Sequence, residues 1–331
     1  MRLENILALT NGKLVNDPFV KKFDTIVFEA KAVKRGDLFI AFDDTMIEEA
    51  VRGGAYGIVF DKPTQITDTE IAWVKVNSCE DSLIKLLRFT LIEKNVTIYE
   101  CNEIVLKLSL QVITDPNFIP VHGDIKEIHK QLSSIENEST LLFCPQLCDA
   151  TLFTDIKKIP LDFSNTISIM EQTLFETSFI HANIFYERQL ISPFFMPYLE
   201  ELLYLYKILD VNFRLRKFTP LNHFEAVFVS NKFEIKEFGT SDKVLIFEQN
   251  ASLIESEMNF LQKNASWANL IYIVPASLKI EPSENIFIYK NINKIKEILR
   301  ANSFNFALIA GADTSILTKP TVNHTQLTLD F

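Results

Sequence analysis

Apolar residues in the first part of the chain recur in short runs that predict a mixed α/β domain. Some runs are continuous or alternate with polar residues, as in strands, and others repeat every three to four residues, as in amphipathic helices. The expected strands lie at residues 26–28, 38–42, 56–60 and 71–76, and the expected helices at 46–52 and 78–92. We therefore expect one compact αβ domain over residues 1–95.

The last third shows a regular alternation of strand and helix patterns. Apolar runs at 243–247, 270–274, 286–289 and 306–310 predict strands, and amphipathic stretches at 252–264 and 292–302 predict helices. This order is typical of βαβ units and a largely parallel sheet. We expect a Rossmann-like domain over residues 239–312, followed by a tail at 313–331.

The middle of the chain, residues 96–238, has a less regular pattern and is expected to be a reduced central α/β region. Strands are expected at 96–101 and 140–143, helices at 125–132 and 196–209, and either element at 103–113. Two prolines, with a glycine directly after, predict a loop at 115–122. The predicted fold class is thus α/β throughout.

Charge and composition exclude some classes of function. The chain has 43 acidic and 33 basic residues, a formal net charge of −10, whereas direct nucleic-acid binding requires a basic surface. No uncharged apolar stretch of about 18 residues predicts a membrane span. Neither a secretory signal nor a paired cysteine pattern is visible, so we expect a reduced, cytoplasmic protein. No metal site or cofactor is predicted.

The segment at residues 33–59 resembles the N-terminal domain of the Mur ligases. The run Val33–Ala41 (VKRGDLFIA) matches a G-D-x-F-x-A element of that family, and Glu49–Val59 matches a helix ending in Gly-Ala before a short strand. The strand and helix at 73–87 follow in the family's order. Within the family, the resemblance is to the enzyme that adds D-Ala-D-Ala to a UDP-MurNAc-tripeptide.

The resemblance implies a site for a UDP-linked cell-wall precursor. Two family segments that help to hold the uridine nucleotide, D-S-R and D-G-H, correspond here to altered residues. These are Glu29, Ala30 and Lys31 for the first segment, and Asp43 and Asp44, followed by Thr45, for the second. We name these five residues as the ligand-binding candidates.

The resemblance also implies ATP-dependent ligation, which the sequence does not support. The family's central domain opens with a glycine-rich phosphate loop ending in G-K-T, and this chain contains no such motif and only eight glycines. We name no catalytic residue and expect an inactive, Mur-ligase-like protein of peptidoglycan precursor metabolism that acts by binding. The alternative is an active acid–amino-acid ligase with an unrecognised nucleotide site.

The last six residues, QLTLDF, suggest a different function. They resemble the short peptide with which bacterial proteins dock on the DNA polymerase sliding clamp. In such an extended peptide, Gln326 would make a polar contact and Leu327, Leu329 and Phe331 would fill apolar pockets. A clamp-associated adaptor is therefore the second alternative, and an ordinary terminal strand is the structural one.

Overall fold

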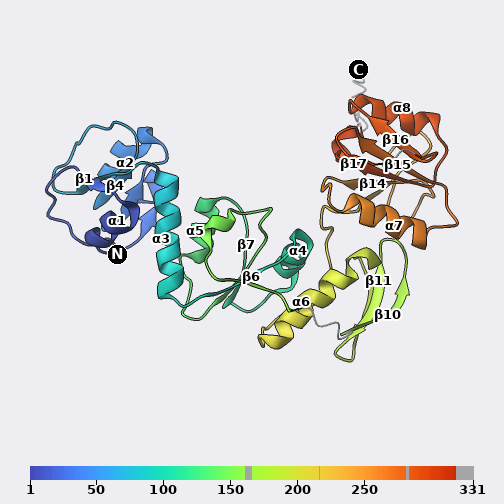
Figure 1. Ribbon diagram of the computed structural model, residues 1–331, viewed down its shortest axis with the longest axis horizontal. Coiled ribbons are helices and arrows are strands. Elements are labelled where there is room, and N and C mark those ends of the chain that lie inside the picture. The colour runs from blue at the N-terminus through green and yellow to red at the C-terminus, as the bar shows by residue number, and fades with distance from the viewer. Residues whose placement is uncertain (161–165, 216, 281–282, 318–331) are drawn as a thin grey trace, which may run out of the picture. The chain divides into compact units, whose positions relative to one another are not determined.

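The computed structural model describes residues 1–160, 166–215, 217–280 and 283–317, whose helices and strands are shown in Figure 1. The chain forms two compact units. Unit 1 comprises Met1–Leu161 and Leu205–Phe213, and unit 2 comprises Asp162–Tyr204 and Arg214–Phe331. The predicted domain boundaries after residues 95, 238 and 312 stay predictions. Gln326, Leu327, Leu329 and Phe331 lie outside the described residues.

The first sheet of unit 1 has five strands in the order β1-β5-β4-β3-β2. β1 runs antiparallel to β5, and all other neighbours in this sheet are parallel. The strands are β1 (Lys13–Leu14), β2 (Ile26–Val27), β3 (Leu38–Ile40), β4 (Gly57–Phe60) and β5 (Ala72–Lys75). The helices are α1 (Leu3–Thr10), α2 (Ile47–Arg52) and α3 (Cys79–Glu93), with 3₁₀ turns η1 (Ala30–Ala32) and η2 (Asp44–Met46).

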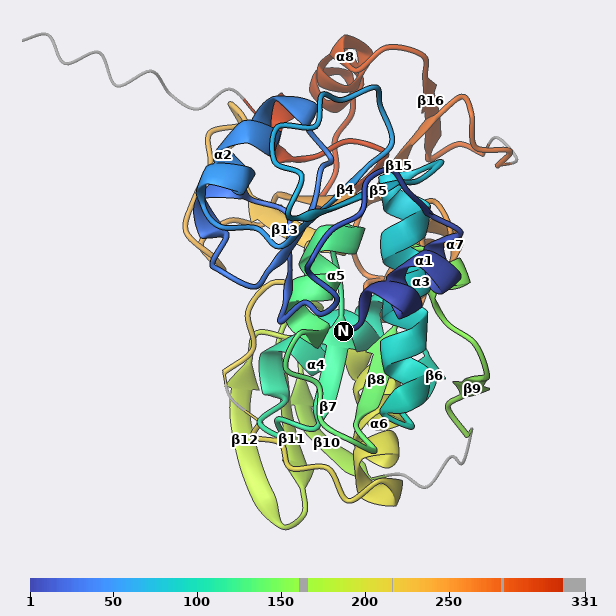
Figure 2. The same ribbon diagram turned by 90° about the vertical axis from the view of Figure 1, so that its left-hand side faces the viewer.

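Helices cover both faces of this sheet because its strands are apolar on both faces. Phe39 and Ile58 pack with Ile47 of α2 on one face. Leu38 and Ile40, which point the other way, belong to the core that α1 and α3 complete. Figure 2 shows α1 (dark blue) packed against α3 (cyan).

The second sheet of unit 1 is wholly parallel, with strand order β7-β8-β6-β9. Its strands are β6 (Thr97–Glu100), β7 (Phe118–Val121), β8 (Thr140–Phe143) and β9 (Ile156–Lys158). Its helices are α4 (Glu103–Val112) and α5 (Ile125–Leu132), and η3 (Ala150–Leu152) precedes β9. The segment at 103–113, for which the pattern allowed either element, is thus helical.

The loop predicted at 115–122 is wrong, because β7 lies within it. Pro120 is part of this strand, opposite Leu142 of β8. Proline cannot donate a ladder hydrogen bond, so it is tolerated where its nitrogen has no neighbouring strand. β7 is an edge strand, which explains how it accommodates Pro120.

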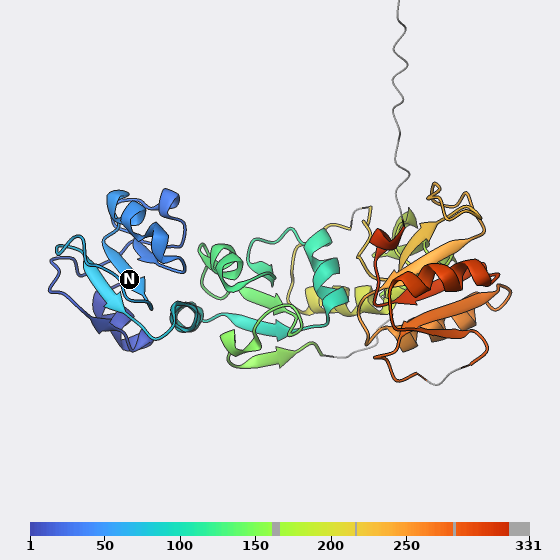
Figure 3. The same ribbon diagram turned by 90° about the horizontal axis from the view of Figure 1, so that it is seen from above.

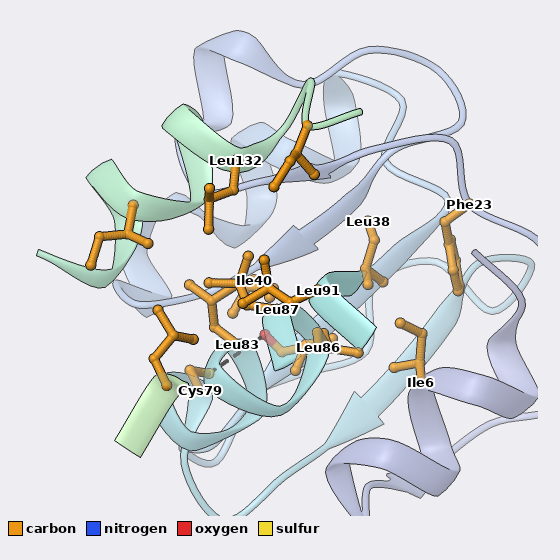
Figure 4. Packing of buried hydrophobic residues seen from close by; sticks show 14 of the residues in the cluster. Ile6, Phe23, Leu38, Ile40, Cys79, Leu83, Leu86, Leu87, Leu91 and Leu132 are labelled. Carbon is orange, nitrogen blue, oxygen red and sulfur yellow. Dashed lines mark hydrogen bonds between the residues drawn. The ribbon is translucent and has the colours of Figure 1, made fainter. Parts of the chain in front are cut away.

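One hydrophobic core extends through unit 1 from the first sheet to the second. Leu83 and Leu87 of α3 belong to the same cluster as Ile40 of β3, Leu132 of α5 and Phe143 of β8. Figure 4 shows the leucines of α3 close to Ile40, and Figure 3 shows α3 (cyan) end-on. α3 therefore joins the two sheets as a shared layer.

Unit 2 contains two further sheets. A three-stranded antiparallel sheet consists of β10 (Ile167–Gln172), β11 (Thr177–His181) and β12 (Ile184–Gln189). A five-stranded sheet has the order β13-β14-β17-β15-β16, with β13 antiparallel and the others parallel. Its strands are β13 (Glu225–Phe228), β14 (Val244–Glu248), β15 (Leu270–Pro275), β16 (Ile286–Tyr289) and β17 (Phe306–Ala310).

The helices of unit 2 are α7 (Ile254–Asn264) and α8 (Asn293–Ala301), with 3₁₀ turns η4 (Pro193–Phe195) and η5 (Thr314–Ile316). The unit boundary falls within a further helix, α6 (Met196–Ile208). The predicted α/β class and the parallel C-terminal sheet are confirmed. Among the described helices, none is long and apolar enough to cross a membrane.

Candidate functional site

The first candidate segment follows β2 at a carboxyl end of the first sheet. Glu29 precedes η1, and its Oε1 lies 2.8 Å from Lys130 Nζ of α5. The hydrogen bond and charge of Lys130 lower the pKa of Glu29. Ala30 is buried in the core beside α2, and Lys31 is exposed. The three candidate residues of this segment therefore differ in environment, and Ala30 is a packing residue.

The second candidate segment follows β3, the neighbouring parallel strand. Asp43 accepts hydrogen bonds from the Thr45 backbone nitrogen (3.0 Å) and hydroxyl (2.7 Å), which lower its pKa. Asp44 Oδ2 lies 3.6 Å from Lys62 Nζ. Asp44 Oδ1 is buried and has no hydrogen-bond partner in the described part of the chain. The side chain of Asp43 thus caps the 3₁₀ turn η2 that follows it, and Asp44 retains an oxygen without a hydrogen bond.

An aromatic contact brings the two segments together. Phe28, just before Glu29, meets Phe42, just before Asp43, edge to face with ring centroids 5.6 Å apart. Helix α5 of the second sheet lies against this pair. The ring centroids of His129 and Phe28 lie 4.9 Å apart, and Lys126 Nζ lies 4.2 Å from the Phe42 ring centroid. Burial lowers the pKa of His129 to about 4, so this side chain is neutral near pH 7.

The contribution of α5 to this site could not be predicted from the sequence. Lys126 and Lys130 are four residues apart on one helix, so their spacing places them on one face. That spacing identifies a basic face but not its partner, because Glu29 lies 101 positions away from Lys130. The contacts of α5 with both candidate segments therefore emerge from the fold.

A cavity of about 410 Å³ remains beside Phe42 and α5. Its apolar wall includes Ile84 and Leu152. The charged residues that line it are Glu80, Asp124, Lys126 and Asp149. Three carboxylates against one ammonium give this cavity a negative charge, which disfavours a diphosphate group.

The thiol in this cavity is not poised to react. Cys148 lines the wall, and burial, followed by the charges of Cys144 and Asp149, raises its pKa to about 11. A thiol must lose its proton to act as a nucleophile or as a metal ligand. In the described residues, no cluster of three or more histidine, cysteine or acidic side chains could hold a metal ion.

The connection from β6 to α4 is where a parallel sheet of this kind would place a phosphate loop. Only Cys101 and Asn102 separate the strand from the helix. Asn102 Oδ1 accepts a hydrogen bond from Val105 N at 2.9 Å, and Cys101 is buried. Glu103 follows in the first turn of α4, and its Oε1 lies 2.7 Å from Lys107 Nζ.

This connection is poorly suited to phosphate. Helix N-termini bind phosphate through free backbone N–H groups and a positive dipole, usually beside small residues. Here the side chain of Asn102 caps the helix, and the first turn carries Glu103, paired with Lys107, in place of a free cation that could neutralise a phosphate. The N-terminus of α5 is closed in the same way, because Asp124 accepts from the backbone nitrogens of Lys126 and Glu127, both at 2.9 Å.

Unit 2 holds a buried acidic group that sequence analysis did not identify. Glu248 ends β14 and accepts hydrogen bonds from His223 Nδ1 (3.0 Å), Phe224 N (3.1 Å) and Asn250 N (2.6 Å). Burial raises the pKa of Glu248, but hydrogen bonds from His223 and Glu257 and the charge of His223 outweigh it, and the net shift is downward.

Glu257 of α7 is the partner acid. Both of its carboxyl oxygens are buried without a hydrogen-bond partner in the described part of the chain, so this environment favours the protonated, neutral acid. Burial, followed by the charge of Glu248, raises the pKa of Glu257. A fully enclosed acid pair of this kind is a structural feature of the Rossmann-like unit.

The four sheets and their connections define the class of fold, that of the Mur ligases, and the predicted resemblance is confirmed at the level of the fold. MurF from Acinetobacter baumannii superposes with a TM-score of 0.52 at 9% identity, covering 93% of this chain and 95% of that one. MurF ligase from Thermotoga maritima, solved in complex with ADP, gives 0.50 at 12% identity, with 88% and 94% covered. No protein-family model and no curated protein matches the sequence.

Proposed function

We propose that this chain is a Mur-ligase-like protein of peptidoglycan precursor metabolism that acts by binding and does not catalyse ligation. The observation that carries this proposal is the connection of Cys101 and Asn102 between β6 and α4. Phosphoryl transfer depends on positioning the phosphates and neutralising their charge. A capped helix end followed by Glu103 supplies neither function.

The contacts around Phe42 support a binding role. Helix α5 holds both candidate segments through Lys126, His129 and Lys130, yet leaves a cavity with apolar and charged walls. We propose that this cavity receives part of a cell-wall precursor or of a protein partner. Its negative lining predicts that the diphosphate of a UDP-linked precursor contributes little affinity.

Calorimetry and a phosphate-release assay test this proposal. The purified chain is titrated with ATP and Mg²⁺, and then with UDP-MurNAc-tripeptide, with a MurF enzyme as the positive control. We expect no ATP binding at millimolar concentration and no phosphate release when D-Ala-D-Ala is added. ATP binding with magnesium-dependent turnover would establish the alternative, an active ligase with an unrecognised nucleotide site.

The C-terminal hexapeptide favours the second candidate function, an adaptor of the DNA polymerase sliding clamp. Its test compares the intact chain with a chain that lacks Gln326–Phe331 in a pull-down with purified clamp. We expect retention of the intact chain and loss on deletion. If the intact chain is not retained, the adaptor function is rejected.

A further inference from the structure

Unit 2 contains a second cavity, of about 610 Å³, separate in chemistry from the site in unit 1. It opens at the amino ends of β14 and β17, where Val244 and Phe306 begin their strands. The turn between β10 and β11 and the segment at 238–242 complete its wall. This volume falls within the range of pockets that enclose small organic molecules.

Aromatic rings line this cavity in a continuous series. The ring centroids of Phe238 and Phe175 lie 6.4 Å apart. The ring centroid of Phe306 lies 6.2 Å from that of Phe175 and 5.9 Å from that of Trp267. The two rings at the ends of the series are the exposed ones: 75% of Trp267 and 47% of Phe238 are accessible. Large aromatic side chains left exposed around a cavity mark a binding surface.

The charges of the cavity add a preference. Arg188 Nη2 lies 3.2 Å from Glu176 Oε2, so these two side chains neutralise each other. The pair lies beside a β-bulge, since the register between β11 and β12 shifts between Thr177 and Phe179 and Arg188 has a left-handed φ of 43°. The third charged side chain in the wall, Asp242, is exposed and makes no ion pair in the described chain.

We propose that this cavity binds a small organic cation whose charged nitrogen carries apolar or aromatic substituents. The faces of Trp and Phe rings attract such a cation, with Trp the strongest, and its substituents cover the exposed rings. Asp242 supplies the compensating charge. An organic anion would have to compete with Glu176 for Arg188 and would be repelled by Asp242.

Three probes that share a phenyl ring compare a cationic, a neutral and an anionic substituent. The full chain is titrated by calorimetry with benzyltrimethylammonium, with neutral benzyl alcohol and with benzoate. We expect the cation to bind about tenfold more tightly than the alcohol, and benzoate not to bind. Trp267 also reports the binding by fluorescence, since Trp73 is 0% exposed and lies in unit 1.

Four variants locate the interaction. Relative to the wild type, Trp267→Ala should weaken cation binding about tenfold and Trp267→Phe by less, because a ring remains. Asp242→Asn should weaken it several-fold. Arg188→Gln should leave cation binding unchanged or strengthen it, because the carboxylate of Glu176 then has no ion-pair partner in this wall. Phe19→Ala, an exposed aromatic in unit 1, is the matched control and should have no effect.

The proposal is overturned if the cation does not bind at millimolar concentration or if the alcohol binds equally tightly. It is also overturned if benzoate binds and Arg188→Gln abolishes that binding. Circular dichroism and thermal melts confirm that each variant is folded, so that loss of binding is not loss of structure. None of these readouts involves ATP or the precursor, so the result is independent of the proposed function.

Discussion

Glu257 illustrates how a single buried proton affects the stability of unit 2. In the folded chain, burial and the neighbouring Glu248 raise its pKa far above the ordinary value of 4.5. Above pH 4.5 the unfolded chain loses this proton while the folded chain keeps it. The stability associated with Glu257 is therefore complete below pH 4.5 and declines as the pH rises towards the folded pKa.

Glu257→Gln should remove this pH dependence, because an amide side chain stays neutral at every pH. The slope for one proton is about 1.4 kcal/mol per pH unit. Between pH 5 and 9 we expect the free energy of unfolding to fall more steeply in the wild type than in the variant. Urea denaturation at several pH values measures both slopes. Glu255→Gln, an exposed position on the same helix, should retain the wild-type slope.

At the residue scale, the sequence named ligand-binding candidates but not their surroundings. The resemblance singles out Glu29 and Asp43, whose roles stay predictions, and their segments meet through the rings of Phe28 and Phe42. Their partners could not be predicted, because Lys130 comes from a distant helix. The acid pair of Glu248 and Glu257 gives no pattern in sequence, since either residue alone looks like a solvated surface charge.

At the element scale, the capped N-terminus of α4 yields a second prediction. Asn102→Ala should lower the free energy of unfolding by about 1 kcal/mol, because the Val105 N–H loses its acceptor, while Asn102→Ser should retain most of the stability. Urea denaturation measures the difference. Equal stability of the alanine variant and the wild type would show that the cap contributes nothing. Neither variant should gain ATP binding, since Glu103 remains.

Most elements of the chain were predictable because their periodicity is strong. The strand at 306–310 and the helix at 125–132 agree with β17 and α5. The failure at β7 has a physical cause: whether Pro120 is tolerated depends on its strand being at the edge of the sheet, which is a property of the topology. Local pattern carries no information about strand order.

At the scale of the whole molecule, the shared core predicts how a core substitution affects both sheets of unit 1. Leu83 is fully buried in α3, within the cluster that reaches both sheets. Leu83→Ala should lower the free energy of unfolding by roughly 2–5 kcal/mol, because the buried side chain is lost and a cavity remains in its place. Because α3 serves both sheets, we expect amide exchange to accelerate in β3 and β4 and equally in β6 and β8.

Hydrogen-exchange mass spectrometry resolves this prediction strand by strand. Strands β14 and β15 belong to unit 2, and their buried residues lie in a different described cluster from Leu83, so their exchange should stay at the wild-type rate and serve as an internal reference. Glu93→Ala, at the exposed end of α3, is the control for any substitution in that helix. If exchange accelerates in the first sheet alone, the two sheets do not form one cooperative unit. If it accelerates in unit 2 as well, the two units unfold together.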